Sequence, residues 1–254
     1  MSSALRVNDL SMDFGGIQAL RGISFEVVPE TICGLIGPNG AGKTTLFNCI
    51  SRVYKPTSGQ IHLGAVDILS VPAHRIAGKG IARTFQNLGL FPQLTLLENT
   101  MAGAHPHSKT GFVRAITRIG VRKEERHLRQ DAYNILKSLN LEKLAFQRAT
   151  GLPFVTLKRL ELARALAAHP QLLLLDEPAG GLTHAEVDSL ASTIRKVRDE
   201  YGLTVLLVEH HMGMVMSLSD KLVAMDNGQL IAEGNPDQVR EDPNVIRAYL
   251  GEKR

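Results

Sequence analysis

The chain has 254 residues, 44% of them hydrophobic and 21% charged, which indicates a soluble, globular protein and excludes a disordered one. Its apolar runs are too short to span a bilayer, its first residues lack the layout of a secretory signal, and two Cys cannot form a disulfide framework, so we expect a reducing cytosol. A net charge of +4 fits nucleic acid, anionic lipid or a nucleotide equally well, but the absence of Trp argues against a stacking platform for single-stranded nucleic acid.

The first part of the chain alternates short strands with turns. Apolar and β-branched residues between Gly and Pro breaks predict strands at residues 5–8, 23–28 and 32–36. Residues 43–52 are typical of a helix that the turn cluster at 56–59 stops. Further strands are expected at 60–63, 171–175 and 204–208, and Asn227-Gly228 predicts a hairpin between 221–225 and 229–232.

The predicted strands and helices suggest an α/β fold. Residues 171–175 and 204–208 are apolar almost throughout, as in strands covered on both faces of a largely parallel sheet. Helix formers dominate from about 97 to 168, and residues 122–139 carry apolar side chains at helical spacing. We therefore predict one domain over 1–254: a mostly parallel core with a helical subdomain at 97–168 and a C-terminal helical tail at 236–254. That tail is expected to form two short helices separated by Pro243.

Residues 37–44 match the phosphate-loop pattern Gly-x-x-x-x-Gly-Lys-Ser/Thr in full, between a predicted strand and a predicted helix. Glycines let backbone N–H groups turn inward around a phosphate, and the helix N-terminus adds partial positive charge. Lys43 would reach the β- and γ-phosphates, and the Thr44 hydroxyl suits Mg²⁺. The alternative is a glycine-rich turn that binds nothing. The predicted nucleotide-binding residues here are Gly37, Pro38, Asn39, Gly40, Ala41, Gly42, Lys43, Thr44 and Thr45.

Two acidic residues, Asp176 and Glu177, follow the apolar run at 172–175. Ligands of open α/β sheets bind at the carboxyl ends of parallel strands, so these carboxylates are expected beside the phosphate loop. Asp176 is then placed to hold the metal's water shell and Glu177 to polarise an attacking water. Alone, the pair would be interpreted as two solvated acids at a strand end.

Together these residues resemble the ATP-binding subunit of ABC transporters along essentially the whole chain, a P-loop NTPase core with an antiparallel β subdomain and an inserted helical subdomain. The resemblance implies a Q-loop role for Gln86, which would touch Mg²⁺ and the attacking water, and a switch role for His210 at the γ-phosphate. It places the D-loop at residues 181–183 and an adenine-stacking aromatic at Phe14. The expected catalytic residues are Glu177, His210 and Gln86, the expected Mg²⁺ ligands are Thr44, Gln86 and Asp176, and the expected ligands are ATP and Mg²⁺.

Three features are similar to branched-chain amino acid importers: the sizeable helical lobe, Leu-Pro-Phe at 152–154, and the ending at 242–251. This resemblance implies two ATPase subunits, alike or paralogous, beneath two integral membrane permeases that an extracytoplasmic solute-binding protein supplies. It implies a peripheral location at the cytoplasmic face of the inner membrane. Nothing in the residues chooses among small solutes, because the solute never touches this subunit.

The signature loop departs from the family pattern Leu-Ser-Gly-Gly-Gln, since Val155 stands where the family has a nearly fixed glycine. In the family dimer this loop presses on the γ-phosphate held by the opposite subunit. A stiff, branched side chain there is expected to obstruct that approach and to strain the backbone. We therefore expect ATP binding to be intact and turnover in a homodimer to be poor, which leaves open a regulatory, weakly hydrolysing subunit. Milder departures are His211 after the switch histidine and Thr183-His184 after Gly-Leu.

A basic stretch lies in the predicted helical lobe. The default interpretation is a solvated helix face, and two more specific interpretations are open. The stretch could contact lipid headgroups or permease loops, or it could contact DNA. Its place in the lobe favours the membrane side, and we expect no nucleic-acid partner. A soluble ABC protein acting on DNA or ribosomes is the remaining alternative, although such proteins usually carry two cassettes or long coiled coils. The stretch comprises Arg114, Arg118, Arg122, Lys123, Arg126 and Arg129.

Overall fold

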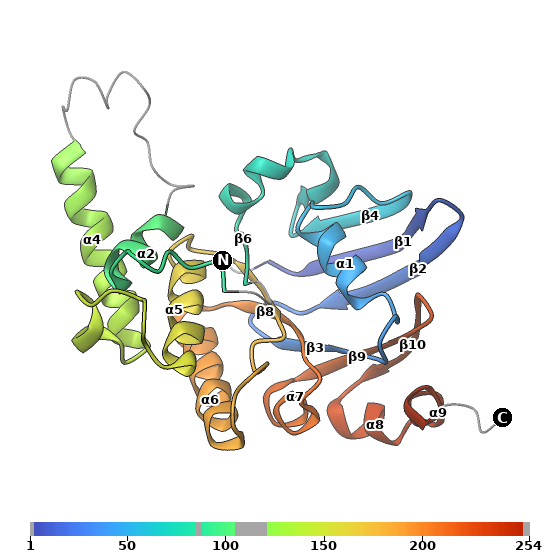
Figure 1. Ribbon diagram of the computed structural model, residues 1–254. Coiled ribbons are helices and arrows are strands. Elements are labelled where there is room, and N and C mark those ends of the chain that lie inside the picture. Colours follow the sequence, from blue (N-terminus) through green and yellow to red (C-terminus); the bar gives the residue numbers. More distant parts are fainter. Residues whose placement is uncertain (1–2, 85–87, 105–120, 251–254) are drawn as a thin grey trace.

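The computed structural model describes residues 3–84, 88–104 and 121–250. Gln86, Arg114, Arg118 and Gly251, which the sequence analysis singled out, lie outside the described residues. The described part contains two sheets with helices packed around them (Figure 1). None of its helices combines the length and the apolar composition needed to cross a bilayer.

The larger sheet of the described residues has six strands in the order β10-β9-β3-β8-β7-β6. Its neighbouring strands run parallel except β9 and β10, which form an antiparallel hairpin. The carboxyl ends of β3, β7 and β8 therefore meet at one edge, where the loops that follow them lie close together. The strands are β3 (Ile32–Ile36), β6 (Ile81–Arg83), β7 (Leu172–Asp176), β8 (Thr204–Val208), β9 (Lys221–Asp226) and β10 (Gln229–Gly234).

The side chains of β7 explain why its sequence is an uninterrupted apolar run. Leu172 and Leu174 belong to a core cluster shared with Phe47 of α1 (Lys43–Ile50). The alternate residues Leu173 and Leu175 point to the opposite face and join a second cluster with helix α6 (His184–Tyr201). Because successive strand residues face opposite sides, a strand covered on both faces needs apolar side chains at every position.

The smaller sheet is antiparallel, in the order β2-β1-β4-β5, and it shares its core with α1 on one face of the larger sheet. Its strands are β1 (Leu5–Phe14), β2 (Ile17–Val27), β4 (Ser58–Leu63) and β5 (Val66–Asp67). Short 3-10 helices occur at Ile68–Ser70, Ala73–Arg75, Ala77–Lys79 and Glu142–Leu144.

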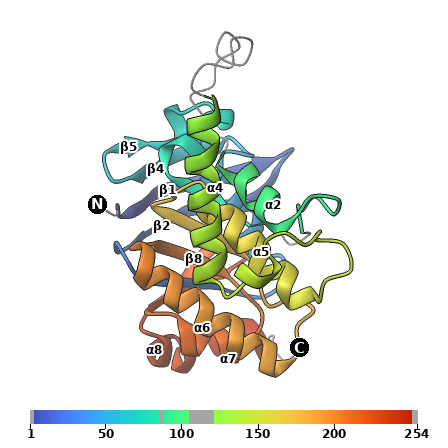
Figure 2. The same cartoon turned by 90° about the vertical axis from the view of Figure 1, so that its left-hand side faces the viewer.

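Three of the described helices gather at the end of the molecule away from the smaller sheet: α2 (Leu96–Gly103), α4 (Val121–Ser138) and α5 (Phe154–Leu166) (Figures 1 and 2). A capping box between Thr95 and Glu98 starts α2. Helices α2 and α5 approach so closely that a Cβ at Gly103 would lie 1.9 Å from the carbonyl oxygen of Arg164. Only a glycine permits this packing.

The C-terminal helices α7 (Met212–Leu218), α8 (Pro236–Glu241) and α9 (Pro243–Leu250) pack around a small core that includes residues of β3 and β9. Asn235 caps α8 and Pro236 occupies its first turn, the position where a missing N–H costs nothing. Val239 and Val245 anchor α8 and α9 to a small core that includes Ile36. The tail thereby packs against the strand that leads into the predicted phosphate loop.

The predicted strands and helices are confirmed, with differences at their ends. The strand predicted at 5–8 is too short, because β1 continues to Phe14 past a positive-φ residue, Asp9, where the pairing with β2 shifts register. The helix predicted at 43–52 is too long, because α1 ends at Ile50 and Arg52 adopts a φ of 63°. The short strand β6 was not predicted, since three residues carry too little pattern.

Candidate functional site

The phosphate loop forms a tight turn between β3 and α1 that only glycines permit at two positions. Gly37 has a φ of 148°, and a Cβ there would lie 2.1 Å from the carbonyl oxygen of Met225. Gly42 has a φ of 100°, and a Cβ there would lie 2.8 Å from the carbonyl oxygen of Ala19. Gly42 is the N-cap residue of α1 and, having no side chain, it caps none of the first amides of the helix. This cradle fits an anion such as a phosphate.

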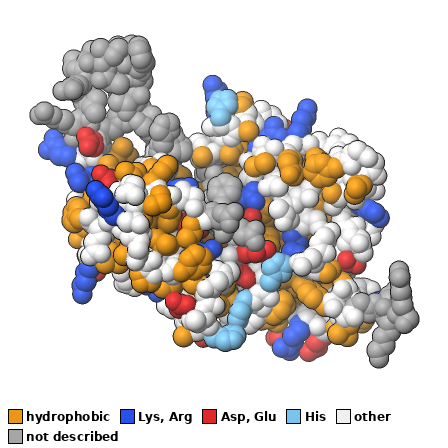
Figure 3. Space-filling model, viewed as in Figure 1, with side chains coloured by type: hydrophobic (Ala, Val, Ile, Leu, Met, Phe, Trp, Pro, Cys, Tyr) orange, Lys and Arg blue, Asp and Glu red, His pale blue; other side chains and the backbone are white. Residues whose placement is uncertain are grey.

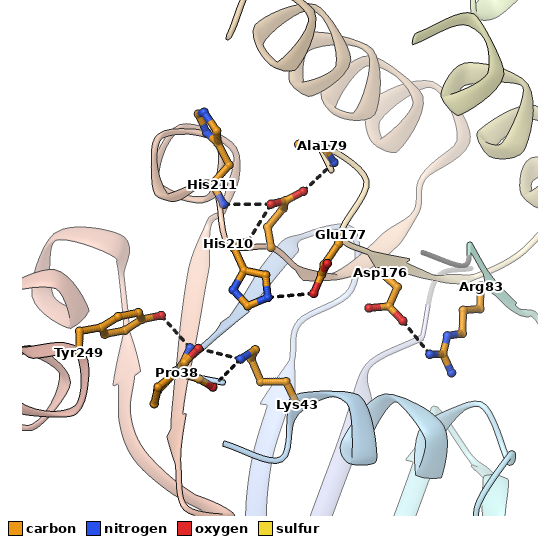
Figure 4. A network of polar contacts seen from close by, with 11 residues as sticks. Pro38, Lys43, Arg83, Asp176, Glu177, Ala179, His210, His211 and Tyr249 are labelled. Atoms are coloured by element: carbon orange, nitrogen blue, oxygen red, sulfur yellow. Dashed lines mark hydrogen bonds and ion pairs between the residues drawn. The ribbon is translucent and has the colours of Figure 1, made fainter. Parts of the chain in front are cut away.

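Lys43 lies inside the turn rather than in solvent. Its Nζ donates hydrogen bonds to the carbonyl oxygens of Gly37 at 2.7 Å and Pro38 at 2.8 Å (Figure 4). Burial lowers the pKa of Lys43, and the nearby Glu177 carboxylate acts in the opposite direction. The ammonium group is thus held beside the cradle.

The loop faces a cavity of about 220 Å³ that also receives Glu177 and His210. The sequence placed these residues far apart, and the meeting strand ends bring them together. Among the predicted nucleotide-binding residues, those at 39–45 line the cavity. Gly37 and Pro38 support the loop from behind through their carbonyl groups.

Glu177 and His210 contact each other across this cavity. His210 Nε2 lies 2.8 Å from Glu177 Oε1, and because a carboxylate only accepts, the imidazole donates from Nε2. The side chains are 47% and 25% exposed for His210 and Glu177, so solvent reaches the pair. On the face seen in Figure 1, His and acidic side chains adjoin near the middle of the surface (Figure 3). Glu177 has a φ of 48°, an uncommon conformation for a non-glycine residue that is enriched at functional sites.

Glu209 is a buried residue whose importance the sequence analysis missed. Its carboxylate accepts hydrogen bonds from the backbone N–H of Ala179 at 2.6 Å, His210 at 2.8 Å and His211 at 3.0 Å (Figure 4). It therefore joins the turn after β7 to the loop after β8. The signal available in the sequence was its place at the end of an apolar strand, directly before the predicted switch histidine.

Asp176 ends β7 but does not line the cavity. Its Oδ2 lies 2.7 Å from Nη2 of Arg83, and both side chains are buried. Phe14 also lies outside the cavity lining, at the end of β1, and packs edge-to-face against Tyr54 with ring centroids 5.3 Å apart. The structure thus brings the loop, Glu177 and His210 together at the cavity, whereas Asp176 and Phe14 are not among its lining residues.

The departures from the family pattern at 184 and 211 are in contact. His211 Nε2 lies 3.2 Å from His184 Nδ1, and His211 Nδ1 accepts the N–H of Met214 at 3.3 Å as the N-cap of α7. Since Nδ1 accepts, Nε2 is the protonated nitrogen of a neutral His211 and donates to His184. The start of α6 is therefore linked to the switch loop by two histidines.

Val155 is the second residue of α5 and is partly buried. It is not among the described residues with positive φ, so the expected backbone strain at this position is wrong. The neighbouring Phe154 ring covers Gly181, where a Cβ would lie 3.1 Å from Cε1. Only the steric part of the expectation about Val155 remains.

The Tyr249 hydroxyl accepts a hydrogen bond from the Gly37 N–H at 2.8 Å (Figure 4). Burial raises the pKa of Tyr249, and the bond from Gly37 counteracts part of that shift. The C-terminal helix α9 therefore reaches the first residue of the phosphate loop, a contact that sequence spacing gives no means to foresee.

Comparisons with known proteins agree with this geometry. Residues 20–180 match the family described as "ABC transporter", and residues 229–254 match the one described as "Branched-chain amino acid ATP-binding cassette transporter". The chain is similar to the branched-chain amino acid transport ATP-binding protein BraF of Pseudomonas aeruginosa, at 43% identity, and to LivG of Escherichia coli K12, at 40%. Each comparison covers 98% of both chains.

The crystal structure of MJ1267 in its ADP conformation, an ATP-binding cassette of an ABC transporter, superimposes with a TM-score of 0.85 at 31% identity and covers 99% of this chain and all of that one. The fold class predicted from the sequence is thereby confirmed. The chain belongs to the ABC transporter family, as one of its ATP-binding cassettes.

Proposed function

We propose that this chain binds and hydrolyses ATP in the cavity beside the phosphate loop and thereby powers the import of branched-chain amino acids through membrane permeases. The observation that carries this proposal is the meeting of an anion cradle, Lys43, Glu177 and His210 at one cavity. The relatives BraF and LivG, at 43% and 40% identity, are branched-chain amino acid transport ATP-binding proteins, which supports the choice of solute.

In this proposal the backbone amides of the loop bind the phosphates, and Lys43 exchanges its two carbonyl acceptors for phosphate oxygens. Thr44 and Asp176, with Gln86 outside the described residues, supply the hard oxygen ligands that Mg²⁺ prefers. Bound Mg²⁺ would neutralise phosphate charge and orient the leaving group. Phe14 is the aromatic residue proposed to stack on adenine.

Glu177 is the proposed general base. It accepts a proton from water as the water oxygen bonds to the γ-phosphorus and the bond to ADP breaks. His210 donates to Glu177 at 2.8 Å, which fixes the carboxylate. We propose that its ring also contacts the γ-phosphate. Glu209 holds the turn after β7 and the loop after β8 together through the hydrogen bonds that it accepts from three backbone N–H groups.

The proposed assembly has two ATPase subunits under two permeases at the cytoplasmic face of the membrane, supplied by an extracytoplasmic binding protein. The N-terminus of α5 would complete the partner subunit's site, and the helices α2, α4 and α5 would act as the helical subdomain. Because Val155 stands at that N-terminus, a second candidate function is a nucleotide-binding regulatory subunit with weak hydrolysis.

Reconstitution in liposomes tests the proposal. The chain, co-purified with its permeases and supplied with binding protein, should take up radiolabelled leucine only when ATP is present on the cassette side. Glu177→Gln should abolish uptake while binding ATP, and Glu200→Gln, the same change at an exposed site, should not alter uptake. Uptake that persists in Glu177→Gln contradicts the proposal, and ATP binding without hydrolysis in the wild type would favour the regulatory alternative.

A further inference from the structure

Arg83 is a buried cation at the end of β6, beside the acidic end of β7. Its side chain is only 8% exposed, and its Nη2 donates to Asp176 Oδ2 at 2.7 Å. The two strands run parallel with Arg83 in register with Leu174, so the guanidinium reaches past the strand end to the carboxylate (Figure 4). Removing two charges from water is costly, so such a pair persists only where its geometry is favourable.

The same guanidinium is also attached to α1, the helix that begins with the phosphate loop. Its Nη1 donates to Asn48 Oδ1 at 2.7 Å and to Ser51 Oγ at 2.9 Å. The cation also lies over the Phe47 ring, 5.6 Å from the centroid. Arg83 therefore holds Asp176 at a fixed position relative to α1, and only a planar, multidentate donor can make these contacts at once.

The two carboxylate oxygens of Asp176 consequently differ in their hydrogen bonding. Oδ2 is occupied by Arg83, and within the described part of the chain Oδ1 has no hydrogen-bond partner. The backbone is fixed as well, because the Asp176 N–H donates to Thr84 Oγ1 and the Thr84 N–H donates to Leu174 O. A carboxylate held in this way presents one oxygen to a ligand without having to reorganise.

We propose that Arg83 is a positioning residue for the magnesium–nucleotide complex: it orients Asp176 through Oδ2 so that Oδ1 serves the metal. This inference rests on the proposed function, in which Asp176 helps to hold Mg²⁺. The positive charge of Arg83 also opposes a nearby cation. The positioning effect is the larger one, because hydrogen-bond partners that orient a metal-holding carboxylate typically contribute about 10- to 100-fold in metal affinity.

Arg83→Lys separates these effects, because it keeps the charge and removes the planar fork. The Kd for ADP is measured by calorimetry with Mg²⁺ and again with EDTA. We expect Arg83→Lys to leave the Kd in EDTA within about twofold and to reduce the tightening by Mg²⁺ about tenfold. Arg6→Lys is the matched control, since Arg6 pairs with Glu26 at 3.1 Å on the exposed side of the smaller sheet, and it should change neither Kd.

Asn48→Ala is a second variant that keeps the ion pair and loosens its attachment to α1. It should also reduce the tightening of ADP binding by Mg²⁺, but by a smaller factor than Arg83→Lys. If Arg83→Lys does not fold, Asn48→Ala provides the test instead. An unchanged Mg²⁺ effect in folded Arg83→Lys overturns the inference, and so does an equal loss of affinity with Mg²⁺ and with EDTA, which would place Arg83 among merely structural residues. A wild-type chain that binds no nucleotide, or that Mg²⁺ does not affect, overturns the proposed function and this inference with it.

Discussion

His210 Nε2 and Glu177 Oε1 lie 2.8 Å apart at the ends of two neighbouring strands, β8 and β7. The buried carboxylate of Glu209 joins the loops that carry them. The position of the proposed general base thus depends on a contact between two loops rather than on either loop alone.

His210→Ala should lower the rate of ATP hydrolysis by about 10²-fold or more, because Glu177 loses the donor that orients it. The Kd for ATP should stay within about threefold, since the loop amides and Lys43 provide the phosphate contacts. Single-turnover hydrolysis and calorimetric binding measure the two quantities. His74→Ala, at an exposed site, should change neither. Equal hydrolysis rates for His210→Ala and the wild type would remove this role from His210.

Tyr249→Phe should weaken ATP binding about fivefold, because a lost hydrogen bond to Gly37 costs about 1 kcal/mol. Tyr201→Phe is the matched control: the Tyr201 hydroxyl lies 3.0 Å from that of Ser138, away from the loop. It should lower the free energy of unfolding and leave the Kd for ATP unchanged. If both variants bind ATP like the wild type, α9 contributes only to folding.

Local patterns predicted much of this site. The phosphate loop, the acidic pair and the apolar strands are each contained in a few consecutive residues, and the parallel arrangement of strands then determines where they meet. The side chains of β7 alternate between two cores, as its uninterrupted apolar run predicts.

The supporting contacts could not be predicted, because they join residues that are distant in the chain. Gly37 and Tyr249 are 212 positions apart, and Arg83 and Asp176 are 93 apart. No spacing rule connects such pairs without the completed fold. The expected strain at Val155 was wrong because the sequence does not define where α5 begins. The structure shows that Val155 lies inside α5, and a helical backbone accepts valine.

Val155→Gly should raise the ATPase rate of the dimer about fivefold, because an anion at a helix N-terminus gains about 1 kcal/mol when its approach is not obstructed. Since the backbone at Val155 is not strained, Val155→Ala should recover most of that gain. Hydrolysis rates and ATP-driven dimerisation, the latter in a Glu177→Gln background, measure the effect. Rates equal to the wild type in both variants would show that this loop tolerates valine.

The two thiols give a prediction about pH. Cys33 and Cys49 are fully buried, and burial raises the pKa of Cys33 from its ordinary value of 9.0 to about 12 and that of Cys49 to about 11. At pH 8 the folded chain should therefore resist iodoacetamide, whereas the chain in denaturant should react at both sites, as intact mass spectrometry can show.

The same shifts predict a loss of stability in alkali. Above pH 9 the unfolded thiols lose protons that the folded thiols keep up to about pH 11 and 12, so the free energy of unfolding falls as pH rises through this range. Other groups titrate there too, since the pKa of Tyr249 is also raised and that of Lys43 is lowered. Urea unfolding between pH 8 and 11 should therefore compare the wild type with the double variant Cys33→Ala/Cys49→Ala. The difference in stability between them should shrink as pH rises, and a constant difference would show that the thiols do not contribute.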